Sequence, residues 1–387
     1  MNNQRWMSQN FFTFYMTWGI FLPYWTGFLI EAKGLTVGQA SLIMSFGLAV
    51  RGISTMFAFP YISRKRSSKR VLDILAIASL ITVLFFIPAS SFNSLFIVTL
   101  LFSFFFPALM PALDSVAGIL VQHGQLHYGK SRSYGSLGFV VMVLIVSVIT
   151  GKFGDVTIVW LLLGGLIMLV ILNTRPAPAI LLEKAKEKHS NKFSLKQLLQ
   201  TPNFLIVIII AVLLQGAHAS YYNYGYIYLQ ELEVPKYYIG LIINIGVFFE
   251  IIFFAKSDRL VGHLKPVTLL IIAAIGSTMR WLMVSLVPTI PIFIISQSLH
   301  AVSFALAHFA VILFFTQHLK KEQIPTAQGM YNAFAMSWST AALTLLGGYL
   351  YEIEPRFAFL GMVICTVPAL FLALYLKKRD YQQSLDL

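Results

Sequence analysis

The sequence predicts an all-α membrane protein with twelve transmembrane helices in two pseudo-symmetric six-helix bundles. The prediction rests on the composition, on apolar runs of about 20 residues, and on the distribution of lysine and arginine. Of the 387 residues, 58% are hydrophobic and 11% are charged, whereas about one quarter of a soluble domain is charged. This composition excludes a globular enzyme that merely carries a membrane anchor.

Apolar runs long enough to cross a bilayer recur along the whole chain. The first, about residues 11–30, is followed by no small-residue cleavage site, so we expect it to remain in the protein as the first helix. The predicted helices are 9–31, 39–62, 71–90, 93–121, 132–151, 155–174, 203–230, 237–256, 266–287, 291–316, 326–350 and 356–377.

Lysine and arginine are concentrated in the loops of one side. The other side has only Lys33, Lys152, Lys236 and Arg356. The positive-inside rule therefore places both termini in the cytoplasm, and topology explains the net charge of +13 better than nucleic-acid binding does. The basic loops include Arg5, 64–70, 130–132, 175–196, 256–265, 320–321 and 377–379.

A long polar stretch in the middle divides the chain into halves. We expect an N-terminal bundle at 1–174, a cytoplasmic linker at 175–202 and a C-terminal bundle at 203–387. A basic loop follows the second helix of each half, at 64–70 and at 256–265. Two six-helix repeats around a cavity are typical of a secondary transporter.

Five ionisable residues lie inside apolar stretches: Arg51, Asp114, Arg132, Glu250 and Arg280. An ionised side chain in hydrocarbon costs roughly 2.5–3.5 kcal/mol on insertion scales, so such residues persist when they are paired or face a water-filled cavity. Opposite charges within the helices of one membrane chain therefore favour a transporter.

Particular segments resemble the major facilitator superfamily. Residues 257–262 (SDRLVG) resemble its loop motif, whereas the first-half copy at 63–66 (SRKR) has no aspartate. Residues 128–135 (YGKSRSYG) resemble the start of helix 5 in the lactose permease branch of proton symporters. That branch also has counterparts of Asp114, Arg132, Arg280 and His300, but Ser303 stands where the lactose permease has its proton-carrying glutamate, and Glu250 lies one or two turns later than the matching carboxylate.

A closer resemblance is to the bacterial 3-phenylpropionate permease family. It is carried by 19–25 (GIFLPYW), 128–130 with 135–136, and 214–222 (LQGAHASYY), and it extends from the first helix to the last. The resemblance implies a multi-pass protein of the bacterial inner membrane that couples protons to the uptake of a small aromatic carboxylate, such as 3-phenylpropionic acid, by symport. We expect a monomer with no nucleic-acid partner.

The resemblance implies a functional role for each ionisable residue. The Arg132 guanidinium is a planar fork of donors that can bind a substrate carboxylate through both oxygens. Asp114 is expected to hold this guanidinium when no substrate is bound. The alternative is that Arg132 is one more positive charge on the cytoplasmic side. Glu250 is the expected proton carrier, because desolvation favours its neutral form; the alternative is a static ion pair. Arg280 is either the partner of Glu250 or a second substrate anchor. Arg51 could pair with either carboxylate or meet the substrate.

Histidines and aromatic residues complete the candidate site. His300 and His308 are about two turns apart, and histidine suits a proton relay near neutral pH, although packing is an alternative role. Trp18 and Tyr222, with Gln215, are expected to contact the aromatic ring of a substrate, unless they only pack. No HExxH or Cys/His spacing indicates a metal site. We expect no cofactor, the coupling ion being the proton.

Three other functions compete with this reading. A non-transporting sensor should carry a sizeable soluble domain, whereas the longest loop here has about 26 residues. A proton symporter of a neutral sugar or nucleoside would share the same layout. A membrane-embedded enzyme would need a nucleophile with its base or a set of metal ligands, and the sequence has no Gly-x-Ser-x-Gly motif.

Overall fold

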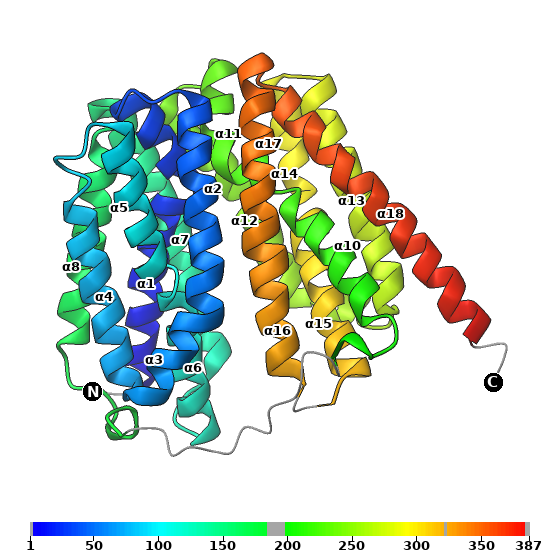
Figure 1. The fold of residues 1–387 in the computed structure, drawn as a ribbon, viewed down its shortest axis with the longest axis horizontal. Coiled ribbons are helices and arrows are strands. Elements are labelled where there is room, and N and C mark those ends of the chain that lie inside the picture. The colour runs from blue at the N-terminus through cyan, green and yellow to red at the C-terminus, as the bar shows by residue number, and fades with distance from the viewer. Residues whose placement is uncertain (1–2, 184–197, 321–322, 384–387) are drawn as a thin grey trace. The chain divides into compact units, whose positions relative to one another are not determined.

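The computed structural model describes residues 3–183, 198–320 and 323–383, which are almost entirely helical (Figure 1). They form twelve helical stretches at the predicted positions, so the predicted fold class is confirmed. Eight of the stretches are long and apolar enough on their own to cross a membrane, and Thr157–Asn173 is a shorter apolar helix.

The chain forms two compact units, Met1–Lys188 with Pro235–Leu241, and His189–Val234 with Ile242–Leu387. The predicted linker at 175–202 lies partly outside the described residues, so the predicted domain limits stay a prediction. Helix α12 contributes its first turns to one unit and its remainder to the other.

The first unit contains the first six helical stretches. In chain order its elements are α1 (Asn3–Gly27), η1 (Phe28–Ala32), α2 (Val37–Ile53), η2 (Ser54–Ala58), α3 (Phe59–Lys65), α4 (Ser68–Leu84), α5 (Phe92–Phe105), α6 (Leu109–Gln122), α7 (Tyr128–Phe153), α8 (Thr157–Asn173) and η3 (Ala179–Leu181).

The second unit contains the other six. Its elements are α10 (Phe204–Gly216), α11 (Ala219–Glu231), most of α12 (Lys236–Val261), α13 (Pro266–Leu286), α14 (Ile290–Ser298), η4 (Ala301–Leu306), α15 (Ala307–His318), α16 (Ile324–Ala333), η5 (Phe334–Trp338), α17 (Ser339–Ile353) and α18 (Phe357–Gln383).

Several stretches are interrupted where proline or a wider turn disturbs the helix. Pro107 separates α5 from α6, because proline cannot donate the backbone hydrogen bond of a continuous helix. The elements η1, η2, η4 and η5 are π-helical turns within longer stretches. Such turns are rare and are often found at functional sites.

One predicted helix is shorter than expected. The third helix was predicted to run to residue 90, but α4 ends at Leu84 and a turn follows. Lys33 Nζ donates to the carbonyl oxygens of Phe86 (2.7 Å), Ile87 (3.3 Å) and Ala89 (2.7 Å). A lysine that satisfies carbonyls beyond a helix end stabilises the termination, since those groups have no partner within the helix.

Glycines allow α1 and α7 to approach closely. A Cβ atom at Gly138 of α7 would lie 2.3 Å from the Phe12 carbonyl oxygen, and one at Gly19 of α1 would lie 2.9 Å from that of Phe139. Small residues at helix crossings bring backbones together in membrane proteins, where packing replaces much of the hydrophobic driving force.

The first turns of α12 contact α7 and the loop that follows it within the first unit. Lys236 Nζ forms an ion pair with buried Asp155, and Ser147 Oγ donates to the Lys236 carbonyl. The Gly240 amide donates to the same Ser147 Oγ at 2.9 Å, and a Cβ at Gly240 would lie 2.6 Å from the Val143 carbonyl oxygen.

The second unit has an apolar core, and its outer surface is also partly apolar. The core is formed by α10, α13, α15 and neighbouring helices, with residues such as Leu214, Leu270 and Phe314 buried. Large side chains on α18, including Ile364 and Phe371, are exposed, as expected for a lipid-facing helix.

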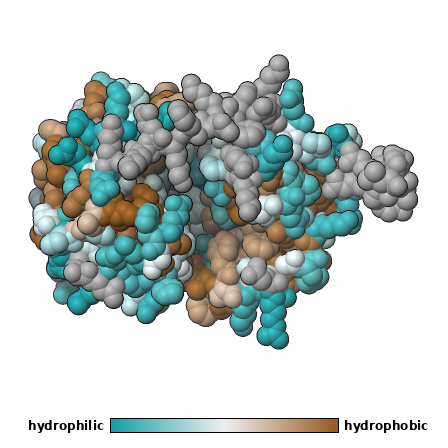
Figure 2. Space-filling model, turned by 90° about the horizontal axis from the view of Figure 1, so that it is seen from below, coloured by the Kyte–Doolittle hydropathy of each residue, from teal (hydrophilic) through white to brown (hydrophobic). Residues whose placement is uncertain are grey.

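The end where α3 and α6 lie is mainly hydrophilic, with hydrophobic patches (Figure 2).

We predict that Gly138→Ala lowers the free energy of unfolding by about 1–3 kcal/mol, because the added methyl group overlaps the Phe12 backbone. The matched control is Gly164→Ala on α8, where a Cβ meets nothing within 4 Å and alanine improves helix propensity. Melting temperatures of the purified variants in detergent test this. Equal melting of the two variants would contradict the close α1–α7 crossing.

Candidate functional site

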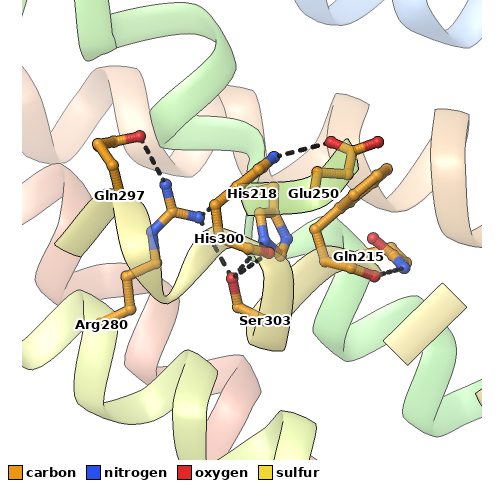
Figure 3. A network of polar contacts seen from close by, with 8 residues as sticks. Gln215, His218, Glu250, Arg280, Gln297, His300 and Ser303 are labelled. Atoms are coloured by element: carbon orange, nitrogen blue, oxygen red, sulfur yellow. Dashed lines mark hydrogen bonds and ion pairs between the residues drawn. The ribbon is translucent and has the colours of Figure 1, made fainter. Parts of the chain in front are cut away.

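The second unit contains a fully buried arginine. Arg280 is in the later part of α13 and is 0% exposed. Its Nη1 donates to His300 Nδ1 at 2.8 Å and to Ser303 Oγ at 3.2 Å, and its Nη2 donates to Gln297 Oε1 at 3.4 Å (Figure 3). All three partners come from the stretch α14–η4, so this one stretch positions the guanidinium.

The helix geometry places these partners on one side. Gln297, His300 and Ser303 are spaced three residues apart, which puts them on neighbouring turns of one helical face. The π-helical turn η4 begins at Ala301 and includes Ser303, so the interruption lies at the network.

His300 connects Arg280 to Glu250. Arginine has only donors, so His300 Nδ1 must accept, and the hydrogen of the neutral ring is on Nε2. His300 Nε2 lies 3.5 Å from Glu250 Oε2 (Figure 3). The sequence suggested a pairing of Arg280 with Glu250, and the structure places the histidine ring in contact with both.

His218 also belongs to the network, which it joins through Ser303. It lies between α10 and α11, is fully buried, and its Nδ1 is 3.0 Å from the Leu214 carbonyl oxygen. A carbonyl can only accept, so Nδ1 carries the hydrogen, and Nε2 accepts from Ser303 Oγ at 3.1 Å. Ser303 therefore accepts from Arg280 and donates to His218.

Aromatic rings enclose the polar network. The Arg280 guanidinium carbon lies 4.6 Å from the centre of the Tyr221 ring and 4.5 Å from that of Trp281. The Phe304 ring stacks on His300 with centroids 5.4 Å apart and nearly parallel planes. Tyr222 lies beside His218, with its ring centre 5.9 Å away. Such surroundings lower the local dielectric and strengthen every charge interaction in the site.

No carboxylate is paired with Arg280 among residues 3–183, 198–320 and 323–383: every ion pair found there within 4 Å involves other cations. Its Nε also lacks a hydrogen-bond partner in these ranges. Removing an ion from water costs several kcal/mol even after relaxation, and an opposite charge normally repays it. The direct partners of Arg280 are all neutral acceptors, and the carboxylate of the network, Glu250, contacts His300 rather than the guanidinium.

The other predicted residues of the second unit lie at different distances from this network. Gln215 is buried and its Nε2 donates to the Phe304 carbonyl at 3.4 Å, beside the network. Tyr222 lies next to both histidines of the network. His308 is further along α15, where its Nδ1 is 2.9 Å from the Tyr331 hydroxyl. The proposed roles of all three stay predictions.

The first unit holds a separate arginine cluster. The Arg132 guanidinium lies over the Tyr15 ring at 4.1 Å, and a Cβ at Gly135 would collide with that ring at 2.7 Å. Asp114 accepts a hydrogen bond from Tyr128 at 3.1 Å and interacts electrostatically with Arg132. The predicted neighbourhood of Asp114 and Arg132 is therefore present, and their function stays a prediction.

Arg51 and Trp18 are also neighbours within the first unit. The Arg51 guanidinium lies 5.3 Å from the centre of the Trp18 ring, which is a cation–π distance. Trp18 is buried and stacks on Phe14 and Phe106. Packing, the alternative role for this tryptophan, is thus part of what it does.

Sequence reasoning missed Gln297, Ser303 and His218 as members of the site. The sequence did contain a signal for Gln297 and Ser303, since each lies one helical turn from His300. His218 had no such signal, because its contact with Ser303 joins residues 85 positions apart.

The architecture and the buried charges define a secondary transporter, and comparison with known proteins gives the family. Residues 4–361 match the MFS_1 like family. The chain belongs to this family; it is a transporter of the major facilitator superfamily, not an enzyme.

Several known proteins are similar over nearly the whole chain. The probable 3-phenylpropionic acid transporter of Escherichia coli (strain K12) is 30% identical over 96% of this chain and 97% of its own. The maltose permease of Geobacillus stearothermophilus is 27% identical, covering 96% and 93%. The crystal structure of the nucleoside transporter NupG matches with a TM-score of 0.81 at 16% identity, covering 97% and 98%, which supports the fold alone.

We predict that Ser303→Ala lowers the free energy of unfolding by about 1–3 kcal/mol, since it removes the hydroxyl between Arg280 and His218. Ser277→Ala is the matched control: Ser277 is equally buried, but its hydroxyl has no hydrogen-bond partner in the described part of the chain. Thermal unfolding in detergent measures the difference. A Ser303 variant as stable as the Ser277 variant would argue against the hydroxyl bridge.

Proposed function

We propose that this transporter couples protons to the uptake of a small aromatic carboxylate, such as 3-phenylpropionate. The printed name of the E. coli relative supports the substrate class. The observation that carries the proposal is the fully buried Arg280, which has only neutral acceptors around it. A substrate carboxylate would bring a negative charge into direct contact with the guanidinium.

Between the two arginine clusters, the surroundings favour Arg280 as the anion site. Arg132 already has Asp114 nearby, so part of its charge is balanced within the protein. Neither arginine has a carboxylate within 4 Å in the described ranges, but Arg280 is fully buried whereas Arg132 is partly exposed. Binding an anion at Arg280 therefore recovers more electrostatic free energy than binding it at Arg132.

The aromatic residues around Arg280 suit the apolar part of such a substrate. Tyr221, Tyr222 and Phe304 offer ring edges and faces that can pack against a phenyl group. Tyr222 is partly exposed whereas Arg280 is fully buried. We therefore propose that the carboxylate reaches the guanidinium when side chains around Tyr222 move aside.

Charge balance couples the proton to the anion. Within the network, Arg280 and ionised Glu250 carry opposite charges, so the empty network is neutral. A bound carboxylate makes it negative by one charge, and one proton restores neutrality, which a low-dielectric site favours. Glu250 suits proton exchange because its side chain is 27% exposed, while His300 beside it is 4% exposed.

The distribution of lysine and arginine supports an orientation with both termini in the cytoplasm. We propose the bacterial inner membrane as the location, as for a carrier that brings a small acid into the cell. The expectation of a monomer stays a prediction.

We predict that Arg280→Met reduces gradient-driven uptake of labelled 3-phenylpropionate by about 30-fold or more in proteoliposomes, because the variant removes the buried cation. Passive leak is subtracted with empty liposomes. Arg66→Met, which removes an exposed loop charge, is the control. Arg132→Ala in the same series tests the sequence prediction for that residue.

Wild-type protein that accumulates no 3-phenylpropionate above empty liposomes would refute the proposed cargo. Competition by unlabelled maltose or nucleosides would then point to the neutral-substrate alternative, which the similarity to a maltose permease keeps worth measuring.

We predict that Glu250→Gln abolishes accumulation driven by an inward proton gradient but retains exchange of external for internal substrate. Glutamine preserves the shape of the side chain but cannot bind or release the coupled proton. Counterflow in preloaded proteoliposomes measures exchange, and Glu31→Gln, at an exposed glutamate, is the control. Accumulation that survives in the Glu250 variant would remove this residue from the coupling step.

A further inference from the structure

Gln297 occupies an unusual place beside the buried arginine. It lies on α14, is 0% exposed, and its Oε1 accepts from Arg280 Nη2 at 3.4 Å. Its Nε2 donates to the Phe293 carbonyl, also at 3.4 Å. Both distances are at the long end for N–H···O hydrogen bonds, so the amide is held weakly on both sides.

A glycine of α12 provides the space for this side chain. A Cβ at Gly246 would lie 3.0 Å from Gln297 Oε1 and 3.3 Å from His300 Cβ. The pocket around the amide oxygen is thus already close-packed. Glutamate and methionine, which have nearly the length of glutamine and are unbranched, would fit this space, whereas a branched or larger residue would not fit without a shift.

The Gln297 amide contacts the edge of the Arg280 guanidinium whose N–H groups can still donate hydrogen bonds. Nη1 is used by His300 and Ser303, Nε has no partner in the described ranges, and Nη2 has a long bond to Gln297. The Tyr221 side chain also interacts with the guanidinium. Nε and Nη2 form one edge of the planar fork, and a carboxylate can accept from such a pair with both oxygens. The single amide oxygen of Gln297 cannot accept from both nitrogens in this paired way.

We infer that Gln297 is a specificity-determining residue: its neutral amide keeps the Arg280 fork uncompensated, so that a carboxylate ligand can take the place beside it. This inference rests on the proposed function, since it assumes an anionic substrate at Arg280. A glutamate at this position would form an internal ion pair with Arg280 and remove the charge that selects an anion.

The test compares Gln297→Glu with Gln297→Met, which has a similar length but neither charge nor a strong acceptor. The probes are 3-phenylpropionate and its neutral analogue 3-phenylpropionamide, titrated by calorimetry into purified full-length protein. The Glu variant should bind the carboxylate about 30-fold or more weakly than wild type. The Met variant should keep the carboxylate preference over the amide.

A second readout does not depend on the cargo. The empty Gln297→Glu protein should melt at a higher temperature than wild type in detergent, because the buried cation gains a carboxylate in direct contact and a proton on Glu250 keeps the network neutral. A purely structural amide predicts the opposite, a lower melting temperature for both variants and an equal loss of both probes.

The outcomes separate this inference from the proposed function. If wild type binds 3-phenylpropionate and Gln297→Glu binds it within about threefold, the inference is overturned and the proposed function stands. If wild type binds no 3-phenylpropionate, the proposed function fails and the inference fails with it. Weak carboxylate binding together with raised melting temperature in the Glu variant supports both.

Discussion

A guanidinium taken completely out of water, without a carboxylate beside it, is the constraint on which the second unit depends. Arg280 is held by an imidazole, a hydroxyl and an amide, and is flanked by two aromatic rings. Each contact recovers part of the desolvation cost, but none neutralises the charge. The free energy left uncompensated in the empty protein is available to a ligand that brings a negative charge.

The fold was readable from the sequence because its determinants are local. A run of about 20 apolar residues predicts a spanning helix whatever its neighbours are, and the twelve stretches appear where these runs lie. The exceptions are ends set by distant residues: α4 stops early at a turn whose carbonyls bind Lys33, more than 50 residues away in the chain. The close α1–α7 crossing likewise depends on which backbone faces Gly138.

The candidate site was only partly readable for the same reason. Intramembrane charge singled out Arg280 and Glu250, since burial in hydrocarbon is costly wherever it occurs. Sequence could not show that the His300 ring contacts both, because that depends on how the helices rotate against one another. No spacing pattern in the sequence predicts the contact of His218 with Ser303. None predicts the π-helical turn that contains Ser303 either.

The geometry of the two histidines makes protons and the arginine mutually dependent. His300 Nδ1 accepts directly from Arg280, and His218 Nε2 accepts from the serine that Arg280 also contacts. A proton added to either nitrogen would remove an acceptor from the network and place a second positive charge near the first. A carboxylate on Arg280 opposes that repulsion. A substrate carboxylate at Arg280, as proposed, and a proton would therefore act on one connected set of hydrogen bonds, so each would change the free energy of binding the other.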